Sequence, residues 1–295
     1  MRKFLRRYLG YPLEGLGAAL LYGLLTILPT DAASALGGWF GRSFGPWIPL
    51  SNRARGNLRA AFPEKGPAEI EALVKAMWDN LGRTIGEYPH LDDIDFSGAD
   101  GRIVYHGLEH VDALRDDGQP GIFFAAHLAN WEICSCITTE RGLPLMRIYR
   151  AANNPLVEWI FRAGRKNILG KLVPKGADGG RQLIAEMREG GHIGLLVDQK
   201  MNDGIPVPFF GRPAMTAAAL ARLAIRFGCP LVGCQMVRKK GARFEAFFTP
   251  PFTFPTTGDT EADLLAAMTE VNRIIEGWVR QNPAQWLWLH RRWPD

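Results

Sequence analysis

Residues 121–132 read GIFFAAHLANWE, an apolar strand that ends directly before a histidine, His127. In open α/β sheets, ligands bind beyond the carboxyl ends of the strands, so His127 stands where a functional site is expected. A helix is expected to follow, with Asn130 as its N-cap and Glu132 ionised in its first turn. We expect Glu132 to hydrogen-bond one ring nitrogen of His127, which leaves the other nitrogen free to take a proton from a hydroxyl.

The rest of the chain alternates short apolar runs with amphipathic stretches of helix length. This alternation predicts an α/β fold with a mostly parallel central sheet flanked by helices. The runs expected to form strands are residues 103–105, 122–126, 145–149, 193–197, 231–237 and 244–248. Residues 49–90 predict a helical cap, because their apolar positions recur near helical spacing. We assign residues 45–295 to one catalytic domain.

The N-terminus has the pattern of a membrane-anchoring segment, which we assign to residues 1–44. Residues 15–29 carry no charge, and a second uncharged run reaches residue 41, but neither has the ~20 residues of a spanning helix. Four cations precede the first uncharged run: Arg2, Lys3, Arg6 and Arg7. Anionic headgroups on the cytoplasmic face of a membrane attract each such cation by ~1 kcal/mol. We expect an anchor that either spans shallowly or lies in the interface, with a buried core helix as the alternative.

Composition excludes several classes of protein. Apolar residues make up 47% of the 295 residues and charged residues 22%, which is globular usage. The net charge is +5, of which the N-terminal cations supply four, so the basic balance does not predict nucleic-acid binding. The four cysteines lack the spacing of a metal site and favour a reducing compartment. Motifs typical of serine hydrolases, zinc proteases and nucleotide-binding enzymes are absent from the sequence, and we expect no metal and no cofactor.

Four blocks in order along the chain resemble one family. HLANWE is similar to the His-x4-Asp/Glu motif of the glycerolipid acyltransferase superfamily, and its full form resembles the branch of lipid A late acyltransferases. Residues 149–165 (YRAANNPLVEWIFRAGR), residues 198–200 (DQK) with the later VPFFG, and residues 285–293 (QWLWLHRRW) are similar to three further family blocks. The resemblance covers the chain from about residue 15 to residue 293. It implies an enzyme that adds a secondary acyl chain from a thioester to a hydroxyl of a lipid A precursor.

The resemblance also implies which residues act. The catalytic residues that it assigns are His127, Glu132, Arg165 and Asp198. The substrate-binding residues are Asn130, Arg150, Asn154, Gln199 and Arg212. Asp198 follows the run 193–197 as His127 follows 122–126, so we expect both to point into one crevice, reached by Arg165 from the preceding helix. The implied donor is an acyl thioester of an acyl carrier protein or of coenzyme A, and the resemblance favours the carrier protein. The implied location is the cytoplasmic face of the inner membrane.

The charge of two segments is compatible with these partners. Residues 147–175 hold seven cations against one acid, and residues 211–240 hold six cations and no acid. Such segments suit a diphosphorylated lipid and an acidic carrier protein. The chain departs from the family pattern at Ala151, and at Lys200 and Met201 after the Asp-Gln pair. The second departure leaves other acceptors open, either a glycolipid or a glycerophospholipid, and a non-catalytic lipid-binding protein is the alternative from another class.

Overall fold

The apolar runs pair into one seven-stranded sheet in the order β1-β9-β8-β2-β5-β3-β4. The computed structural model describes residues 8, 10–149, 151–163, 168 and 170–293. The strands of this sheet are β1 (Ile103–His106), β2 (Gly121–Ala125), β3 (Leu145–Tyr149), β4 (Leu172–Pro174), β5 (His192–Leu196), β8 (Leu231–Arg238) and β9 (Phe244–Phe248). From β8 to β4 all neighbours are parallel, whereas β9 runs antiparallel to β8, and β1 is parallel to β9. The predicted mostly parallel sheet is therefore confirmed, and all six predicted strands form.

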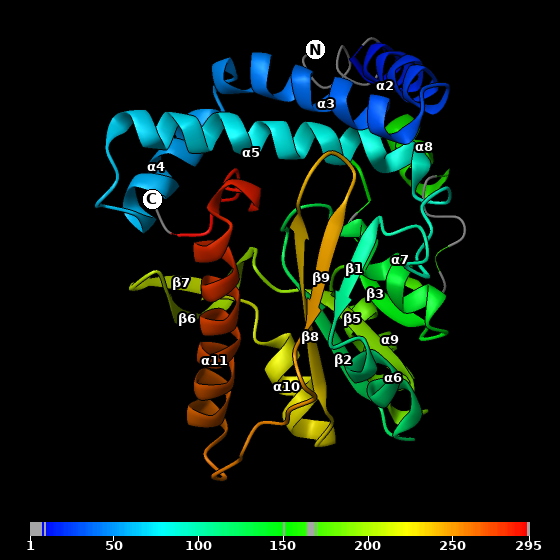
Figure 1. Ribbon diagram of the computed structural model, residues 1–295. Coiled ribbons are helices and arrows are strands. Elements are labelled where there is room, and N and C mark those ends of the chain that lie inside the picture. The colour runs from blue at the N-terminus through cyan, green and yellow to red at the C-terminus, as the bar shows by residue number, and fades with distance from the viewer. Residues whose placement is uncertain (1–7, 9, 150, 164–167, 169, 294–295) are drawn as a thin grey trace.

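Helices cover both faces of this sheet, as predicted (Figure 1). The helices of this part of the chain are α6 (Glu109–Asp116), α7 (Glu132–Glu140), α8 (Pro155–Ala163), α9 (Ala177–Arg188), α10 (Ala219–Phe227), α11 (Thr260–Gln281) and the 3-10 turn η4 (Pro283–Gln285). Ile122 and Phe124 of β2 pack into the core beneath α9, α10 and α11. Phe123 and Ala125, on the opposite face, pack into a second core with α6 and α7. The alternation of side chains along one fully buried strand thus divides the interior into two cores.

Three strands were not predicted from the sequence. One is the short strand β4, and the other two, β6 (Lys200–Phe209) and β7 (Arg212–Thr216), form a separate antiparallel pair. Pro206, Pro208 and Pro213 lie within this pair. Because proline removes a ladder donor, such a run does not read as a strand.

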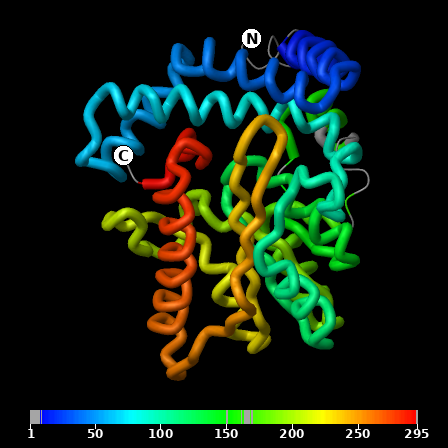
Figure 2. Tube along the Cα trace, viewed as in Figure 1, coloured from blue at the N-terminus to red at the C-terminus, as the bar shows by residue number. Residues whose placement is uncertain are grey.

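The predicted helical cap is confirmed as α4 (Ser51–Ala61), α5 (Pro67–Glu87) and the 3-10 turn η3 (Tyr88–His90). Before it come α2 (Tyr11–Thr26), α3 (Thr30–Phe44) and the 3-10 turn η2 (Gly45–Trp47). Helix α3 lies along α5, at the end of the molecule where β8 ends (Figures 1 and 2). The two backbones touch: a Cβ atom on Gly37 would overlap the carbonyl oxygen of Gly82, and one on Gly41 would overlap that of Trp78. Only glycine permits this approach.

No helix in the described part of the chain is both long enough and apolar enough to cross a bilayer. Helix α2 has 16 residues, about 24 Å at the usual rise, against ~30 Å of hydrocarbon. The expectation of a shallowly spanning anchor is therefore not supported. The alternative of a buried core helix is also wrong, because Leu13 and Leu20 of α2, and Ile27 directly after it, are 66–77% exposed. The four N-terminal cations lie outside the described residues.

Candidate active site

The site is built where two neighbouring parallel strands end. Strands β2 and β5 are paired with Ala125 opposite Leu196, and the amide of Val197 donates to the carbonyl of Ala125. His127 and Asp198 each follow two residues beyond that pair. The register of the sheet therefore brings them face to face, as predicted from the strand ends.

Asp198 is a fully buried carboxylate that holds His127 in two ways. Its Oδ1 accepts from the ring Nδ1 of His127 at 2.8 Å, and its Oδ2 accepts from the backbone amide of His127 at 2.9 Å. The indole Nε1 of Trp286 donates to the same Oδ2 at 2.7 Å. Burial alone raises the pKa of Asp198, but the charge and hydrogen bonds of His127, with a contribution from His290, outweigh it and hold the pKa below its usual range. The carboxylate is thus ionised and accepts a hydrogen bond from the Nδ1–H group of His127. The ring hydrogen is therefore on Nδ1, and Nε2 carries the lone pair.

The expectation that Glu132 holds the His127 ring is therefore corrected. Glu132 does lie in the first turn of α7, as predicted, but the carboxylate bonded to Nδ1 belongs to Asp198. Asn130 is not the N-cap either. That position is held by Trp131, without a side-chain cap bond. The physical reason is the backbone at Ala129, whose φ of 49° turns the chain before the helix and directs Asn130 elsewhere.

Gln199 faces Nε2, the second ring nitrogen of His127. Its amide Nε2 lies 3.0 Å from Nε2 of His127 and 3.4 Å from Nε2 of His290. The two imidazole rings are 5.0 Å apart between centroids. Burial, followed by the charge of His127, lowers the pKa of His290 to about 4. His290 belongs to the block 285–293 that resembles the family, and sequence reasoning assigned it no role.

The strained turn after His127 is held from two sides. The carbonyl of Ala129 accepts from Asn80 Nδ2 at 3.2 Å and from Thr84 Oγ1 at 3.0 Å, both on α5. Its amide donates to the carbonyl of Gln285 at 3.0 Å, and the amide of Leu287 donates to the carbonyl of His127 at 3.1 Å. Helix α5 and the C-terminal segment therefore fix the conformation that presents His127.

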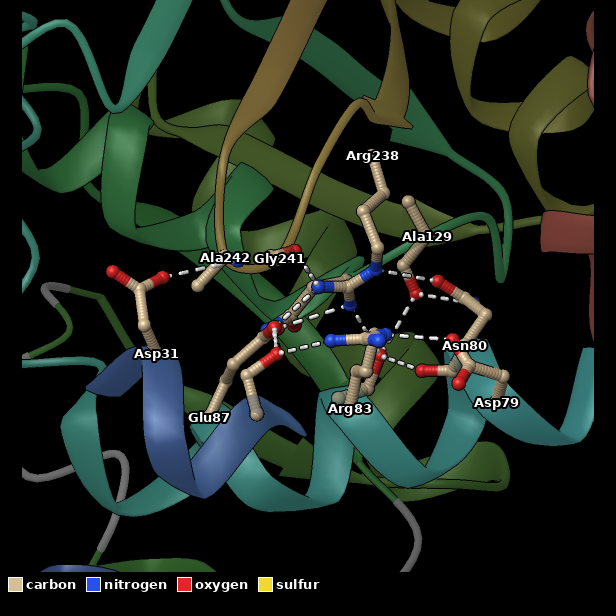
Figure 3. A network of polar contacts seen from close by, with 12 residues as sticks. Asp31, Asp79, Asn80, Arg83, Glu87, Ala129, Arg238, Gly241 and Ala242 are labelled. Carbon is tan, nitrogen blue, oxygen red and sulfur yellow. Dashed lines mark hydrogen bonds and ion pairs between the residues drawn. The ribbon is translucent and has the colours of Figure 1, made fainter. Parts of the chain in front are cut away.

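A buried ion pair between β8 and α5 supports this turn (Figure 3). Arg238 donates to both carboxylate oxygens of Glu87, and its Nε donates to Asn80 Oδ1 at 2.8 Å. Asn130 Nδ2 donates to Glu87 Oε2 at 2.9 Å, and Ser34 Oγ of α3 donates to Glu87 Oε1 at 2.6 Å. The side chain of Glu87 is 0% exposed and that of Arg238 7%. Sequence reasoning missed both residues; the available signal was a charged residue closing the apolar run 231–237.

The remaining predicted residues divide into two groups. Asn154 donates to the carbonyl of Tyr11 at 2.9 Å and accepts from the amide of Leu156, so it joins the start of α8 to α2. Arg212 opens β7, with its guanidinium carbon 5.2 Å from the ring centre of Trp293. The structure brings together His127, Asp198 and Gln199 and gives these two side chains other contacts. Arg150 and Arg165 lie outside the described residues.

Two further sequence features are buried. Trp286, Trp288 and Trp293 are 0–3% exposed and pack in the core. The cysteines are free and buried: Cys134, Cys136, Cys229 and Cys234. Within the residues that the structure describes, no three His, Cys, Asp or Glu side chains gather in a way that would hold a metal ion. The arrangement is suited to proton transfer: a buried carboxylate orients an imidazole whose second nitrogen is a proton acceptor.

Comparison with known proteins relates nearly the whole chain to one family of enzymes. A family profile described as "Bacterial lipid A biosynthesis acyltransferase" matches residues 2–295. The chain is 25% identical to the lipid A biosynthesis palmitoleoyltransferase of Escherichia coli K12, over 98% of this chain and 94% of that protein. It is also 25% identical to the lipid A biosynthesis myristoyltransferase of that organism, over 93% and 84% of the two chains. The solved 1-acyl-sn-glycerophosphate acyltransferase PlsC of Thermotoga maritima aligns with 83% of this chain at a TM-score of 0.40 and 14% identity.

Proposed function

Because the chain belongs to the bacterial lipid A biosynthesis acyltransferase family and is an acyltransferase, we propose that it transfers a secondary acyl chain from a thioester to a hydroxyl of a lipid A precursor. The observation that carries this proposal is the Nε2 lone pair of His127, fixed by Asp198 at the end of β2. Such a nitrogen is the general base that a hydroxyl nucleophile needs.

The chemistry follows from this base. The hydroxyl oxygen attacks the thioester carbonyl carbon while His127 Nε2 takes the hydroxyl proton. A C–O bond forms, the C–S bond breaks as the tetrahedral intermediate collapses, and the leaving thiolate receives the proton from His127. Asp198 stabilises the imidazolium in between. Arg165, by the family resemblance, is the group that stabilises the developing oxyanion.

The donor is proposed to be an acyl carrier protein rather than coenzyme A, as the resemblance implies. An acidic carrier needs exposed cations, and of the six in residues 211–240 four are exposed: Arg222, Arg226, Lys239 and Lys240. Lys239 and Lys240 follow directly after β8, which is parallel to β2, so they lie at the edge of the sheet that carries His127. Arg238, in contrast, is buried and is not available to a partner.

The protein is proposed to lie on the cytoplasmic face of the inner membrane through an apolar N-terminal surface. We define this surface as the exposed side chains Leu13, Leu16, Leu20 and Leu24 of α2, Ile27 directly after α2, Trp39, Phe40 and Phe44 of α3, Trp47 of η2, and Leu156 and Trp159 of α8. Trp39, Phe40 and Phe44 contact one another, and soluble proteins rarely expose such groups of large apolar side chains. Because α2 is too short to span, these residues support an interfacial position rather than a spanning one.

The proposed function is tested with the purified full chain, a diphosphorylated lipid A precursor and either an acyl carrier protein or a coenzyme A thioester. We expect acyl transfer, with mass spectrometry giving the acylated hydroxyl, and a loss of at least ~10²-fold in kcat for His127→Ala without unfolding. A glycerophospholipid acceptor is assayed in parallel. Turnover with that acceptor alone would replace the proposed substrate. A folded His127→Ala variant with wild-type turnover would overturn the mechanism, and lipid binding without turnover in the wild type would identify a binding protein.

A further inference from the structure

The nitrogen that must take the proton already has a hydrogen-bond partner. Asp198 fixes the hydrogen on Nδ1 of His127, so Nε2 is an acceptor, and the amide of Gln199 donates to it at 3.0 Å. A substrate hydroxyl needs the same lone pair. The acceptor hydroxyl therefore has to displace Gln199 before His127 acts as a base.

A second acceptor for that amide lies beside the first. Nε2 of His290 is 3.4 Å from the same amide nitrogen. The lowered pKa of His290, about 4, keeps its ring neutral near pH 7. Because an amide nitrogen can only donate, this contact is a hydrogen bond when the ring hydrogen of His290 is on Nδ1 and its lone pair is on Nε2. The amide of Gln199 thus stands between the two imidazole rings.

Helix α4 holds His290 in this position. Asn57 Nδ2 donates to the carbonyls of Trp288 and His290, both at 2.8 Å. Arg53 Nη1 donates to the carbonyl of Leu289 at 3.1 Å. The backbone on both sides of the ring is therefore anchored. Gln199, in contrast, lies on the loop between β5 and β6 and is exposed, so we assign the movement to its side chain.

We propose that Gln199 caps His127 in the free enzyme and passes its hydrogen bond to His290 when the acceptor hydroxyl binds. This inference rests on the proposed function and adds a positioning role for both residues. This exchange lowers the free-energy cost of displacing Gln199 from His127, because the amide keeps a hydrogen-bond acceptor in His290. Without His290 the amide has only His127, and the substrate must compete with it.

The alternative is that Gln199 binds the acceptor lipid directly, as the sequence resemblance implies. The two roles predict opposite effects of removing the amide. A binding residue contributes to substrate affinity, so its loss lowers kcat/KM for the acceptor. A cap competes with the substrate, so its loss raises kcat/KM for the acceptor.

The test measures kcat/KM for the acceptor at saturating donor in four proteins: the wild type, Gln199→Ala, His290→Ala and the double variant. We expect His290→Ala to lower the value about three- to tenfold, the factor of one neutral hydrogen bond. Gln199→Ala is expected to raise it about two- to fivefold. The double variant should exceed His290→Ala and approach Gln199→Ala, because no cap remains to be displaced. A merely structural role of His290 gives no such suppression.

Controls separate the possible failures. Gln182→Ala, on the exposed face of α9, and His106→Ala, at the opposite edge of the sheet, should behave as the wild type. His290→Asn, whose side-chain oxygen still accepts, should lie between the wild type and His290→Ala, and it serves if the alanine variant does not fold. A Gln199→Ala value at or below that of the wild type, a His290→Ala value equal to that of the wild type, or a double variant no better than His290→Ala overturns the cap. If His127→Ala retains turnover, the proposed function itself fails.

Discussion

Asn130 and Glu87 are joined by a buried hydrogen bond of 2.9 Å from the amide Nδ2 to the carboxylate Oε2. The asparagine of the HLANWE segment thus faces α5 and not the start of α7. Through Ser34, the same carboxylate also contacts α3. The loop that carries His127 is therefore tied to the N-terminal helices by one acidic side chain.

Replacing that acid should cost stability. Glu87→Gln leaves the buried guanidinium of Arg238 without its counter-charge, and we expect the free energy of unfolding to fall by about 3–5 kcal/mol in urea denaturation. Asp178→Asn, which removes an exposed ion pair with Arg181, is the matched control and should change it by less than about 0.5 kcal/mol. A Glu87→Gln variant as stable as the control would show that the pair contributes nothing measurable.

Asp198→Asn should abolish the base while keeping the shape of the site. An asparagine amide donates to Nδ1 of His127, which moves the ring hydrogen to Nε2 and removes the lone pair. We expect kcat to fall by at least ~10²-fold. Glu132→Gln, assayed beside it, should cost less if Asp198 alone orients the ring. The opposite order of losses would return the orienting role to Glu132.

His290 should make stability depend on pH. Its pKa is lowered to about 4 in the fold, so between about pH 6.5 and 4 the unfolded chain binds more protons than the folded one. Stability is therefore expected to fall as pH falls through this window, by at most about 1.4 kcal/mol per pH unit because one ring binds one proton. His290→Asn cannot titrate and should flatten the difference in urea midpoint between pH 7 and pH 5. Equal slopes in the two proteins would contradict the shift.

The apolar N-terminal surface should control binding to lipid. We expect Leu20→Gln, Leu24→Gln and Trp47→Gln, combined, to shift the protein out of the vesicle fraction in flotation with anionic vesicles, at unchanged melting temperature. These side chains are 46–86% exposed, so their loss leaves the core intact. Leu265→Gln, at an exposed position of α11, is the control and should float as the wild type does. Unchanged flotation of the triple variant would place the lipid contact elsewhere.

Arg165 is predicted to act in the transition state. If it stabilises the oxyanion, Arg165→Ala lowers kcat/KM by about 2.7–4 kcal/mol, and Arg165→Lys rescues poorly because an ammonium lacks the planar fork. Both variants are measured at two ionic strengths. A loss below tenfold that shrinks with salt would identify a surface cation instead.

Much of the fold could be predicted from the sequence, and the position of His127 with it. The run 122–126 is apolar on both faces, and a strand buried on both faces belongs to the interior of a parallel sheet. The partner of His127 could not be chosen in the same way. Glu132 is near in sequence, whereas Asp198 is 71 positions away and is brought close only by the register of β2 and β5.

Two other features lay beyond sequence reasoning for physical reasons. A left-handed backbone is rare for alanine, so nothing at Ala129 predicts the turn that displaces Asn130 from the N-cap. Arg238 and Glu87 are 151 positions apart, and each alone has the pattern of a solvated charge. Their pairing depends on where α5 crosses the end of β8, and the spacing of apolar residues along the sequence does not predict that crossing.

The contact between Gly37 and Gly82 has a geometric consequence. Because the backbones of α3 and α5 touch at Gly37 and Gly82, no side chain separates the two helices at that point, and the two helices form a layer of fixed thickness. The aromatic residues on the outside of α3 can then change in size or kind without altering their height above the loop of His127. A leucine side chain at position 37 would push α3 away from α5 and tilt the aromatic residues on the outside of α3. The strands of the sheet below would keep their register.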